Sequence, residues 1–160
     1  MAVAVSPTSV NQLAVGCLNA RVAITMDGGA TWVTKRIRNQ IPNYGFITTA
    51  TWGNFNTLYV GSMFNRVVKS TNGGQTWAPA RNGFPFINVN KLLADWRDIS
   101  GNTVYAATGI GVYRTTDGGA NWSRFGANMP MVEVSDLHLS ADGRLLRAAT
   151  YGRGVWEIGM

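Results

Sequence analysis

The chain is poor in charged residues, cysteine and histidine, and each shortage excludes a class of protein or a kind of site. Only 14% of its 160 residues are charged and 46% are hydrophobic, a balance too apolar for a disordered protein. The single cysteine, Cys17, cannot form an internal disulfide, and we expect it to be a small buried side chain in the apolar run "LAVGCL". The single histidine, His138, has no His or Cys cluster around it, so we expect no metal and no cofactor.

Long apolar runs and an export signal are missing as well. No apolar stretch approaches the ~20 residues needed to cross a bilayer, so we expect no membrane span. The opening "MAVAVSPTSVNQLAVG" has no basic leader and alternates in the manner of a strand, which does not fit a signal peptide. The protein then either stays inside the cell or has its export signal outside this chain.

The charge that is present is basic, with a formal net value of +6. Basic proteins attract nucleic acid and anionic surfaces. The longest basic run is "KRIR" at 35–38, the other basic residues are scattered, and no aromatic–basic motif of a nucleic-acid module occurs. The sequence therefore does not favour nucleic acid as a partner.

One motif occurs three times at a fixed spacing. It reads "TMDGGATW" at 25–32, "STNGGQTW" at 70–77 and "TTDGGANW" at 115–122, which places Asp27, Asn72 and Asp117 45 residues apart. Similar strand-like segments precede each copy, and a fourth such segment, "RLLRAAT", follows at 144–150. A period of this length with short strands and Gly-rich turns predicts a β-propeller.

The pattern within one repeat predicts a single all-β domain over 1–160, built from four-stranded antiparallel blades. Short segments rich in Val, Ile, Tyr and Trp are separated by Gly, Asn or Asp. The blades are expected at about 1–38, 39–82, 83–126 and 127–160, with the fourth lacking its outer strand. The expected strands are 2–8, 12–18, 22–26 and 31–37; 45–52, 56–62, 66–71 and 76–81; 86–96, 102–108, 111–116 and 121–125; and 132–140, 144–150 and 154–158.

The repeated box is expected to be a tight turn before the outer strand of each blade. Its glycines permit positive φ angles, its Asp or Asn can accept hydrogen bonds from backbone amides, and its Trp can pack over the turn. Asn72 favours this structural role because an amide cannot act as a general acid. The predicted structural residues are Asp27, Gly28, Gly29, Trp32, Asn72, Gly73, Gly74, Trp77, Asp117, Gly118, Gly119 and Trp122.

These boxes resemble the Asp-box, or BNR repeat, of sialidases, sortilin-type receptors, propeller xyloglucanases and the photosystem II assembly propeller. The closing "GRLLRAATYGRGVWEI" at 143–158 is similar to the C-terminal end of large bacterial BNR-repeat proteins, often labelled glycosyl hydrolases or exo-sialidases. The resemblance implies an extracellular or cell-surface location. It also implies that the box lies on the face opposite the ligand site, but it does not fix an activity, since one fold hosts many.

An enzyme resembling this family needs particular acids or arginines. A sialidase needs an arginine triad with a Tyr–Glu pair and an acid, and a xyloglucanase needs two opposed carboxylates. The weak catalytic candidates here are Asp95 and Asp136, expected on innermost strands that line the axis. Polar packing and ion pairing around the axis is the preferred interpretation, and no arginine triad can be assembled.

The loops expected on the ligand face offer a better set of binding candidates. Aromatic faces with amide and guanidinium donors suit sugar rings or peptide carbonyls. Ordinary loop composition or contact between subunits remains the alternative. The candidates are Asn19, Arg21, Tyr44, Phe64, Asn65, Arg66, Tyr151 and Arg153.

The sequence therefore predicts a non-catalytic propeller module that binds glycan or protein, with part of a glycoside hydrolase as the alternative. Because an open propeller leaves costly sheet edges, three means of completion stay open. The chain is expected to be half of a propeller of seven or eight blades, to pair with a second copy, or to close alone as a four-bladed ring, in that order. In the first two cases the lone chain should not be a stable monomer.

Overall fold

The computed structural model describes residues 2–37, 39, 41, 45–63 and 66–160. In this part of the chain the structure consists of fifteen β-strands in four antiparallel sheets, joined by turns. No helix that could cross a membrane is found among these residues. The predicted all-β propeller fold is therefore confirmed.

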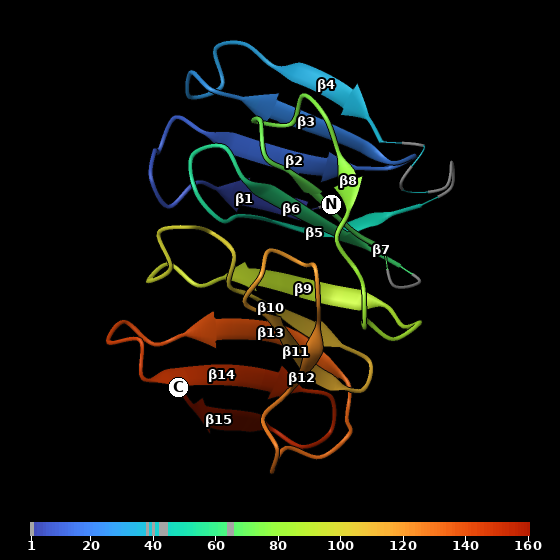
Figure 1. The fold of residues 1–160 in the computed structure, drawn as a ribbon, viewed down its shortest axis with the longest axis vertical. Helices are drawn as coiled ribbons and strands as arrows, with labels where there is room; N and C mark the ends of the chain where they lie inside the picture. The colour runs from blue at the N-terminus through green and yellow to red at the C-terminus, as the bar shows by residue number, and fades with distance from the viewer. Residues whose placement is uncertain (1, 38, 40, 42–44, 64–65) are drawn as a thin grey trace.

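Each of the first three sheets is a meander of four strands, and the fourth has three strands among the described residues (Figure 1). The innermost strands contact one another in succession, β1 to β5, β5 to β9 and β9 to β13. In Figure 1 the outer strands β4 and β15 lie at opposite extremes of the arrangement. The strands are β1 Ala2–Val5, β2 Leu13–Cys17, β3 Arg21–Thr25 and β4 Val33–Arg36; β5 Ile47–Trp52, β6 Leu58–Ser62, β7 Arg66–Ser70 and β8 Ala78–Pro79; β9 Val89–Ala94, β10 Val104–Thr108, β11 Gly111–Thr115 and β12 Ser123–Phe125; and β13 Val134–Leu139, β14 Leu145–Thr150 and β15 Val155–Gly159.

Every predicted strand has a counterpart, but the outer strands are shorter than expected. The segment predicted at 76–81 forms only the two-residue strand β8, and that predicted at 31–37 forms β4, Val33–Arg36. All four residues of β4 and both of β8 are exposed. An outer strand buries little apolar surface, so hydrophobic patterning defines its ends poorly.

Within the described part of the chain, the core consists of three apolar clusters, one between each pair of successive sheets. Alternate residues of a strand point to opposite faces, so one face of a sheet packs on the preceding sheet and the other on the following one. The first cluster shows this, because Ala14 and Val22 of the first sheet meet Trp52, Leu58 and Val60 of the second. We call the face of a sheet that packs on the preceding sheet its leading face, and the face that packs on the following sheet its trailing face.

The connections divide between the two ends of the sheets. The turns β1–β2 and β3–β4 and their equivalents, including the three boxes, lie at one end, which we call the box face. The connections β2–β3 and β4–β5 and their equivalents lie at the other end, which we call the loop face. This division follows from the antiparallel order of each sheet.

Candidate functional site

The first box is closed by a small hydrogen-bond network centred on Asp27. Its Oδ1 accepts from the Thr31 backbone amide at 2.9 Å and from the Thr25 hydroxyl at 2.7 Å. The Thr25 Oγ1 in turn accepts from the Gly29 amide at 2.9 Å. Gly28 and Gly29 have φ angles of 74° and 100°, a region that favours glycine. The box is therefore a capped turn.

The other two boxes repeat this geometry. Asn72 Oδ1 accepts from the Thr76 amide at 2.9 Å, and Asp117 Oδ1 accepts from the Asn121 amide at 2.8 Å. Ser70 and Thr115 hold the place of Thr25, with hydroxyls that bond the box Asn or Asp and accept a glycine amide. The prediction did not include these buried hydroxyls, although a Ser or Thr opens all three repeated stretches.

The box carboxylates are held in their ionised form. Hydrogen bonds from the Thr31 side chain and amide lower the pKa of Asp27 to about 2. Bonds from the Asn121 side chain and amide lower the pKa of Asp117 to about 2 as well. A general acid needs a pKa near the working pH, so neither group is suited to donate a proton.

The box tryptophans differ in their partners. Trp32 and Trp77 each donate from Nε1 to a glycine carbonyl of their own turn at 3.1 Å. Trp122 donates instead to the carbonyl of Ala80, in the preceding sheet, at 2.8 Å. Trp122 is buried and meets the Phe84 ring edge-on at 5.1 Å between ring centroids.

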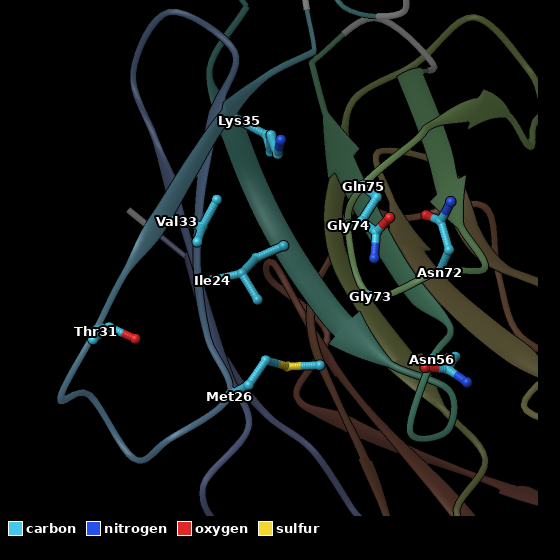
Figure 2. Close-up of a pocket in the computed structure, with 10 residues that line it drawn as sticks. All are labelled: Ile24, Met26, Thr31, Val33, Lys35, Asn56, Asn72, Gly73, Gly74 and Gln75. Atoms are coloured by element: carbon cyan, nitrogen blue, oxygen red, sulfur yellow. The ribbon is translucent and has the colours of Figure 1, made fainter.

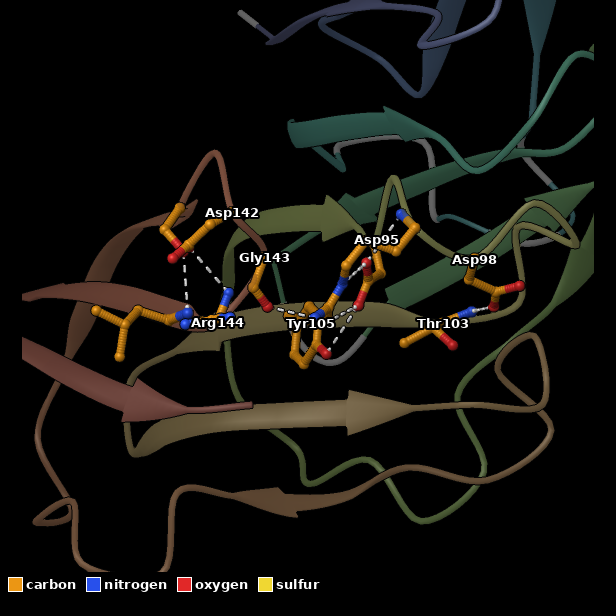
Figure 3. A network of polar contacts seen from close by, with 10 residues as sticks. Asp95, Asp98, Thr103, Tyr105, Asp142, Gly143 and Arg144 are labelled. Atoms are coloured by element: carbon orange, nitrogen blue, oxygen red, sulfur yellow. Dashed lines mark hydrogen bonds and ion pairs between the residues drawn. The ribbon is translucent and has the colours of Figure 1, made fainter.

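Asp95 is held in a network at the box face (Figure 3). It follows the end of β9, beyond the strand in which it was expected, and its Oδ2 lies 2.6 Å from the Arg97 guanidinium and 3.2 Å from the Tyr105 hydroxyl. Arg97 continues the network by donating to the Gly143 carbonyl of the fourth sheet. The pKa of Asp95 is lowered, with burial opposing the stronger combined effect of Arg97 and Tyr105.

Asp136, the other catalytic candidate, lies near the opposite end of the sheets. It lies on β13 opposite Ala149 of β14, and its side chain is exposed. Its Oδ1 pairs with Lys91 Nζ at 3.4 Å. Asp95 lies at the box-face end of an inner strand, whereas Asp136 and Lys91 occupy equivalent registers near the loop-face ends of β13 and β9. The two acids are therefore not brought together around one bond.

All eight carboxylates of the chain have a hydrogen-bonding or ionic partner. Asp98 accepts from Ser100 and Thr103, which lower its pKa to about 2 against the effect of burial. The remaining pairs are Asp142 with Ser140, Glu133 with Asn90, and Glu157 with Arg147. Every carboxyl group with a shifted pKa is shifted downward.

A hollow of about 310 Å³ lies on the outer rim between β3–β4 and the second box (Figure 2). Ile24, Met26 and Val33 form its apolar part, and Lys35 and Gln75 stand at its polar part. No carboxylate lines it. The hollow is a candidate contact site without the groups that hydrolysis requires.

Two further hollows lie on the loop face at equivalent places in the fold. One, of about 400 Å³, lies between the first and second sheets and is lined by Leu18, Phe46 and Cys17, which was expected to be buried and is half-buried. The other, of about 410 Å³, lies between the third and fourth sheets. Its lining combines apolar, amide and carboxylate side chains: Phe86, Ile87, Asn88, Asn90, Ile110 and Glu133.

The predicted binding residues are spread along the loop face. Asn19 has a positive φ of 57° in the β2–β3 turn, a conformation that Asn tolerates, so its place has a structural reason. Arg21 and Arg66 begin β3 and β7, and Arg153 lies exposed in the β14–β15 turn. Among the described candidates, Tyr151 adjoins the second loop-face hollow through its amide, which donates to the Glu133 carbonyl at 2.9 Å. The candidates Tyr44, Phe64 and Asn65 lie outside the described residues.

Sequence reasoning did not single out Phe86, Asn90 or Glu133 as binding residues. Their loops were assigned to the ligand face, but composition alone did not distinguish them from other loop residues. Asn90 Nδ2 bonds both Glu133 and the Val134 carbonyl, so it ties the third sheet to the fourth beneath the hollow. This contact joins residues 43 positions apart and has no local signal in the sequence.

Charge is divided between the two faces. The connections of the box face carry five acids, Asp27, Asp95, Asp98, Asp117 and Asp142. Arg97 and Arg144 are the arginines in those connections. The described connections of the loop face carry Arg81, Arg153 and Glu133, and Arg21, Arg36 and Arg66 stand at the loop-face ends of β3, β4 and β7. The loop face is therefore the basic side of the molecule.

Among the described residues, no group of three His, Cys, Asp or Glu side chains could hold a metal ion.

Comparison with known proteins supports the fold and the repeat. Residues 113–124, within the third repeat, match the family model described as BNR/Asp-box repeat. No curated protein sequence is significantly similar to the chain. The chain is thus a β-propeller that carries the BNR/Asp-box repeat, and its likeness to solved structures extends over nearly its whole length.

Three of the similar structures are described as proteins with different roles. "YCF48 bound to D1 peptide" matches with a TM-score of 0.74 and 19% identity, over 100% of this chain and 51% of that one. The GH74 xyloglucanase from Xanthomonas campestris matches at 0.72 and 16%, over 98% and 28%. Chaetomium thermophilum Sqt1, bound to the N-terminus of the ribosomal protein L10, matches at 0.71 and 16%, over 100% and 43%. The chain spans about half the length of these proteins or less, and at such identities the likeness shows the fold alone.

Proposed function

We propose that this chain is a non-catalytic propeller module whose loop face binds an acidic, extended segment of another protein. The observation that carries the proposal is the division of charge, with arginines on the loop face and carboxylates on the box face. Such a field attracts an anionic partner to one side of the molecule and raises its rate of association. The loop face also holds two hollows that side chains of a bound segment could fill.

The non-catalytic part of the proposal is supported by the carboxylates. A glycoside hydrolase needs two acids about 5–10 Å apart across the substrate, one with a raised pKa. In this chain Asp95 and Asp136 lie toward opposite ends of the inner strands, and the shifted pKa values are lowered. Glu133, in the second loop-face hollow, bonds Asn90 and has no second carboxylate opposite it in the lining.

A protein ligand is supported by the chemistry of that second hollow. Phe86 and Ile110 supply apolar surface, and Asn90 supplies an amide that can bond peptide groups. The similar structures of YCF48 and Sqt1 are described with a bound peptide and a bound protein N-terminus. An extended acidic segment could place side chains in the hollow and carboxylates near Arg153.

A glycan is the second candidate, because an aromatic ring beside amide and carboxylate groups also suits a sugar. The likeness to a xyloglucanase keeps part of a glycoside hydrolase as the alternative. An extracellular or cell-surface location remains a proposal that rests on the sequence resemblance.

The test is a selection on the whole chain from a displayed library of 12-residue peptides, followed by calorimetric titration of the selected peptides. A parallel panel of neutral and acidic glycans, including xyloglucan oligosaccharides, is assayed for binding and for release of reducing ends. We expect acidic peptides to bind, with an affinity that falls as salt rises. We expect no release of reducing ends.

Matched variants locate the site. Phe86→Ala and Arg153→Glu, on the loop face, should each weaken peptide binding about tenfold or more. Phe55→Ala and Arg144→Glu make the same changes on the box face and should leave binding unchanged. Equal losses in both pairs, or xyloglucan cleavage that Asp95→Asn or Asp136→Asn abolishes, would contradict the proposal.

A further inference from the structure

The leading face of the first sheet is apolar and exposed at positions that are buried in every other sheet. Strand registers place Val3 at the position of Ala50, Leu92 and Leu137. Those three residues are at most 7% exposed, whereas Val3 is 64% exposed. Val5 holds the position of the buried Trp52, Ala94 and Leu139 and is 57% exposed. The first sheet therefore has the side chains of an internal blade interface without a sheet against them.

The trailing face of the fourth sheet has the matching feature. Val22, Val67 and Val112 occupy one register position on β3, β7 and β11, and each is fully buried by the following sheet. The fourth sheet has Val155 at this position, and Val155 is 66% exposed. Because the same residue type stands here four times, the exposed copy has the surface that a following sheet covers elsewhere.

Polar contacts across the interfaces between successive sheets also recur. The exposed faces of the first and fourth sheets carry groups at the same positions. Gln12 Nε2 donates to the Phe55 carbonyl at 2.5 Å, and the Tyr59 hydroxyl donates to the Gly101 carbonyl at 2.9 Å. Arg97 donates to the equivalent Gly143 carbonyl. Each acceptor lies in the turn between the two innermost strands of the following sheet, on the box face.

In the first sheet, the residue that holds the position of these carbonyl acceptors is Val10. The box amides show this, since Gly28 bonds the Asn11 carbonyl as Gly73 bonds that of Asn56. At the other end of the chain, Arg147 holds the register position of Tyr59, whose hydroxyl donates to the following sheet. Arg147 Nε donates to Glu157 of its own sheet, and its Nη1 and Nη2 are the nitrogens that can donate outward. The first sheet thus offers an acceptor, and the fourth sheet a donor.

A second set of polar contacts joins the inner strands. Thr49 and Thr51 accept, through Oγ1, from the amides of Leu92 and Ala94 at 2.8 and 3.2 Å. In register, the acceptor positions of the fourth sheet are Asp136 and His138, and the donor positions of the first sheet are Val3 and Val5. A carboxylate and an imidazole can both accept from backbone amides.

We propose that a second copy of this chain covers both ends, with the trailing face of each fourth sheet against the leading face of the other first sheet. The occupant is a second copy because the polar donors and acceptors of one end match those of the other, as well as the apolar positions. Two copies joined twice in this way form a closed head-to-tail ring of eight sheets with twofold symmetry. Trp32, which is 43% exposed in the single chain, is then covered by the partner, as Trp122 is covered within the chain.

The experiment measures the mass of the whole chain in solution by light scattering on a sizing column. The chain has a mass of 17.3 kDa, and we expect a particle of twice that mass at tens of micromolar. Val3→Glu alters only the leading face, Val155→Glu alters only the trailing face, and both side chains are more than half exposed in the single chain. Each variant alone should be a monomer. Ile99→Glu makes the same kind of change at an exposed turn on neither face and should stay dimeric.

A mixture of the two variants tests the direction of packing. In a head-to-tail ring, the intact trailing face of Val3→Glu can bind the intact leading face of Val155→Glu. The mixture should therefore form a heterodimer, weaker than the wild-type dimer because only one of two interfaces remains. Circular dichroism on each variant confirms that it is folded.

Four results would overturn the proposal. A wild-type monomer would mean that other blades, not a second copy, cover the exposed faces. A mass above two chains that grows with concentration would mean that the ring does not close. A dimer that survives Val155→Glu, or variants that do not associate on mixing, would show that the copies do not pack head to tail. Peptide binding by a monomer would leave the proposed function intact, so the two proposals fail separately.

Discussion

The indole of Trp122 donates a hydrogen bond to the carbonyl of Ala80, 42 residues earlier and in the preceding sheet. The third box therefore joins two sheets, in addition to closing its own turn. Trp77, at the same position of the second box, donates within its turn. One repeated sequence motif thus makes different tertiary contacts in different blades.

Replacing these tryptophans should reveal the difference. We expect Trp122→Phe to lower the free energy of unfolding by about 2–3 kcal/mol, because it leaves the Ala80 carbonyl without its donor in a buried place. Trp77→Phe should have a smaller effect, since Trp77 is only half-buried and its bond to Gly74 stays within its own turn. Urea unfolding of both variants measures the order, and equal losses would contradict this reading of the contact.

Asp27→Asn and Asp117→Asn should also differ, with Asn72 as the natural reference. At position 27 an amide can donate to the Thr31 hydroxyl, as Asn72 donates to Thr76, so Tm should hardly change. At position 117 an amide would face the Asn121 side-chain nitrogen, and Asn121 could adapt only by giving up its bond from Asn82. Loss of about 1 kcal/mol there would lower Tm by about 2–4 °C. Thermal unfolding of the two variants provides the measurement.

Acid should weaken the fold over a defined range. The pKa values of Asp27, Asp98 and Asp117 are about 2 in the folded chain, below the ordinary value of 3.8. A lowered folded-state pKa stabilises the protein fully above pH 3.8, and this contribution is lost as pH falls toward 2. We therefore expect Tm to fall between about pH 4.5 and 2. The double variant Asp27→Asn/Asp117→Asn should show a shallower fall, and an unchanged slope would contradict the assignment.

Asp95→Asn and Asp136→Asn should separate a structural role from a catalytic one. Asp95 is buried against Arg97 and Tyr105, so its replacement should cost about 1–3 kcal/mol of stability. The exposed pair of Asp136 and Lys91 should contribute no more than about 1 kcal/mol. Urea unfolding gives both values. A larger loss at Asp136 than at Asp95 would contradict these roles.

The sequence predicted the fold well because the features that define it are local and repeated. The spacing of Asp27, Asn72 and Asp117 defined the blades, and alternation such as that of "AVAV" at 2–5 defined the inner strands. The chemistry of the second loop-face hollow could not be predicted in the same way. It depends on Asn90 meeting Glu133 across two sheets, and on which loop residues stand beside Phe86.

The two catalytic candidates lie apart for a related reason. Asp95 and Asp136 were grouped because both were expected on inner strands. The strand β9 ends at Ala94, so Asp95 turns into the box-face network, while the register of β13 keeps Asp136 near the loop face. A shift of a few residues along a strand decides which end of a propeller a side chain reaches, and periodicity does not fix it.

The most direct test of recognition on the loop face is a chemical-shift map of the isotope-labelled chain titrated with a selected acidic peptide. We expect the amides of Asn90, Gly109, Ile110 and Glu133 to move, and those of the box glycines Gly28, Gly73 and Gly118 not to move. Shifts concentrated at the boxes, or around Gln75 in the rim hollow, would contradict it by placing recognition on the wrong side of the propeller.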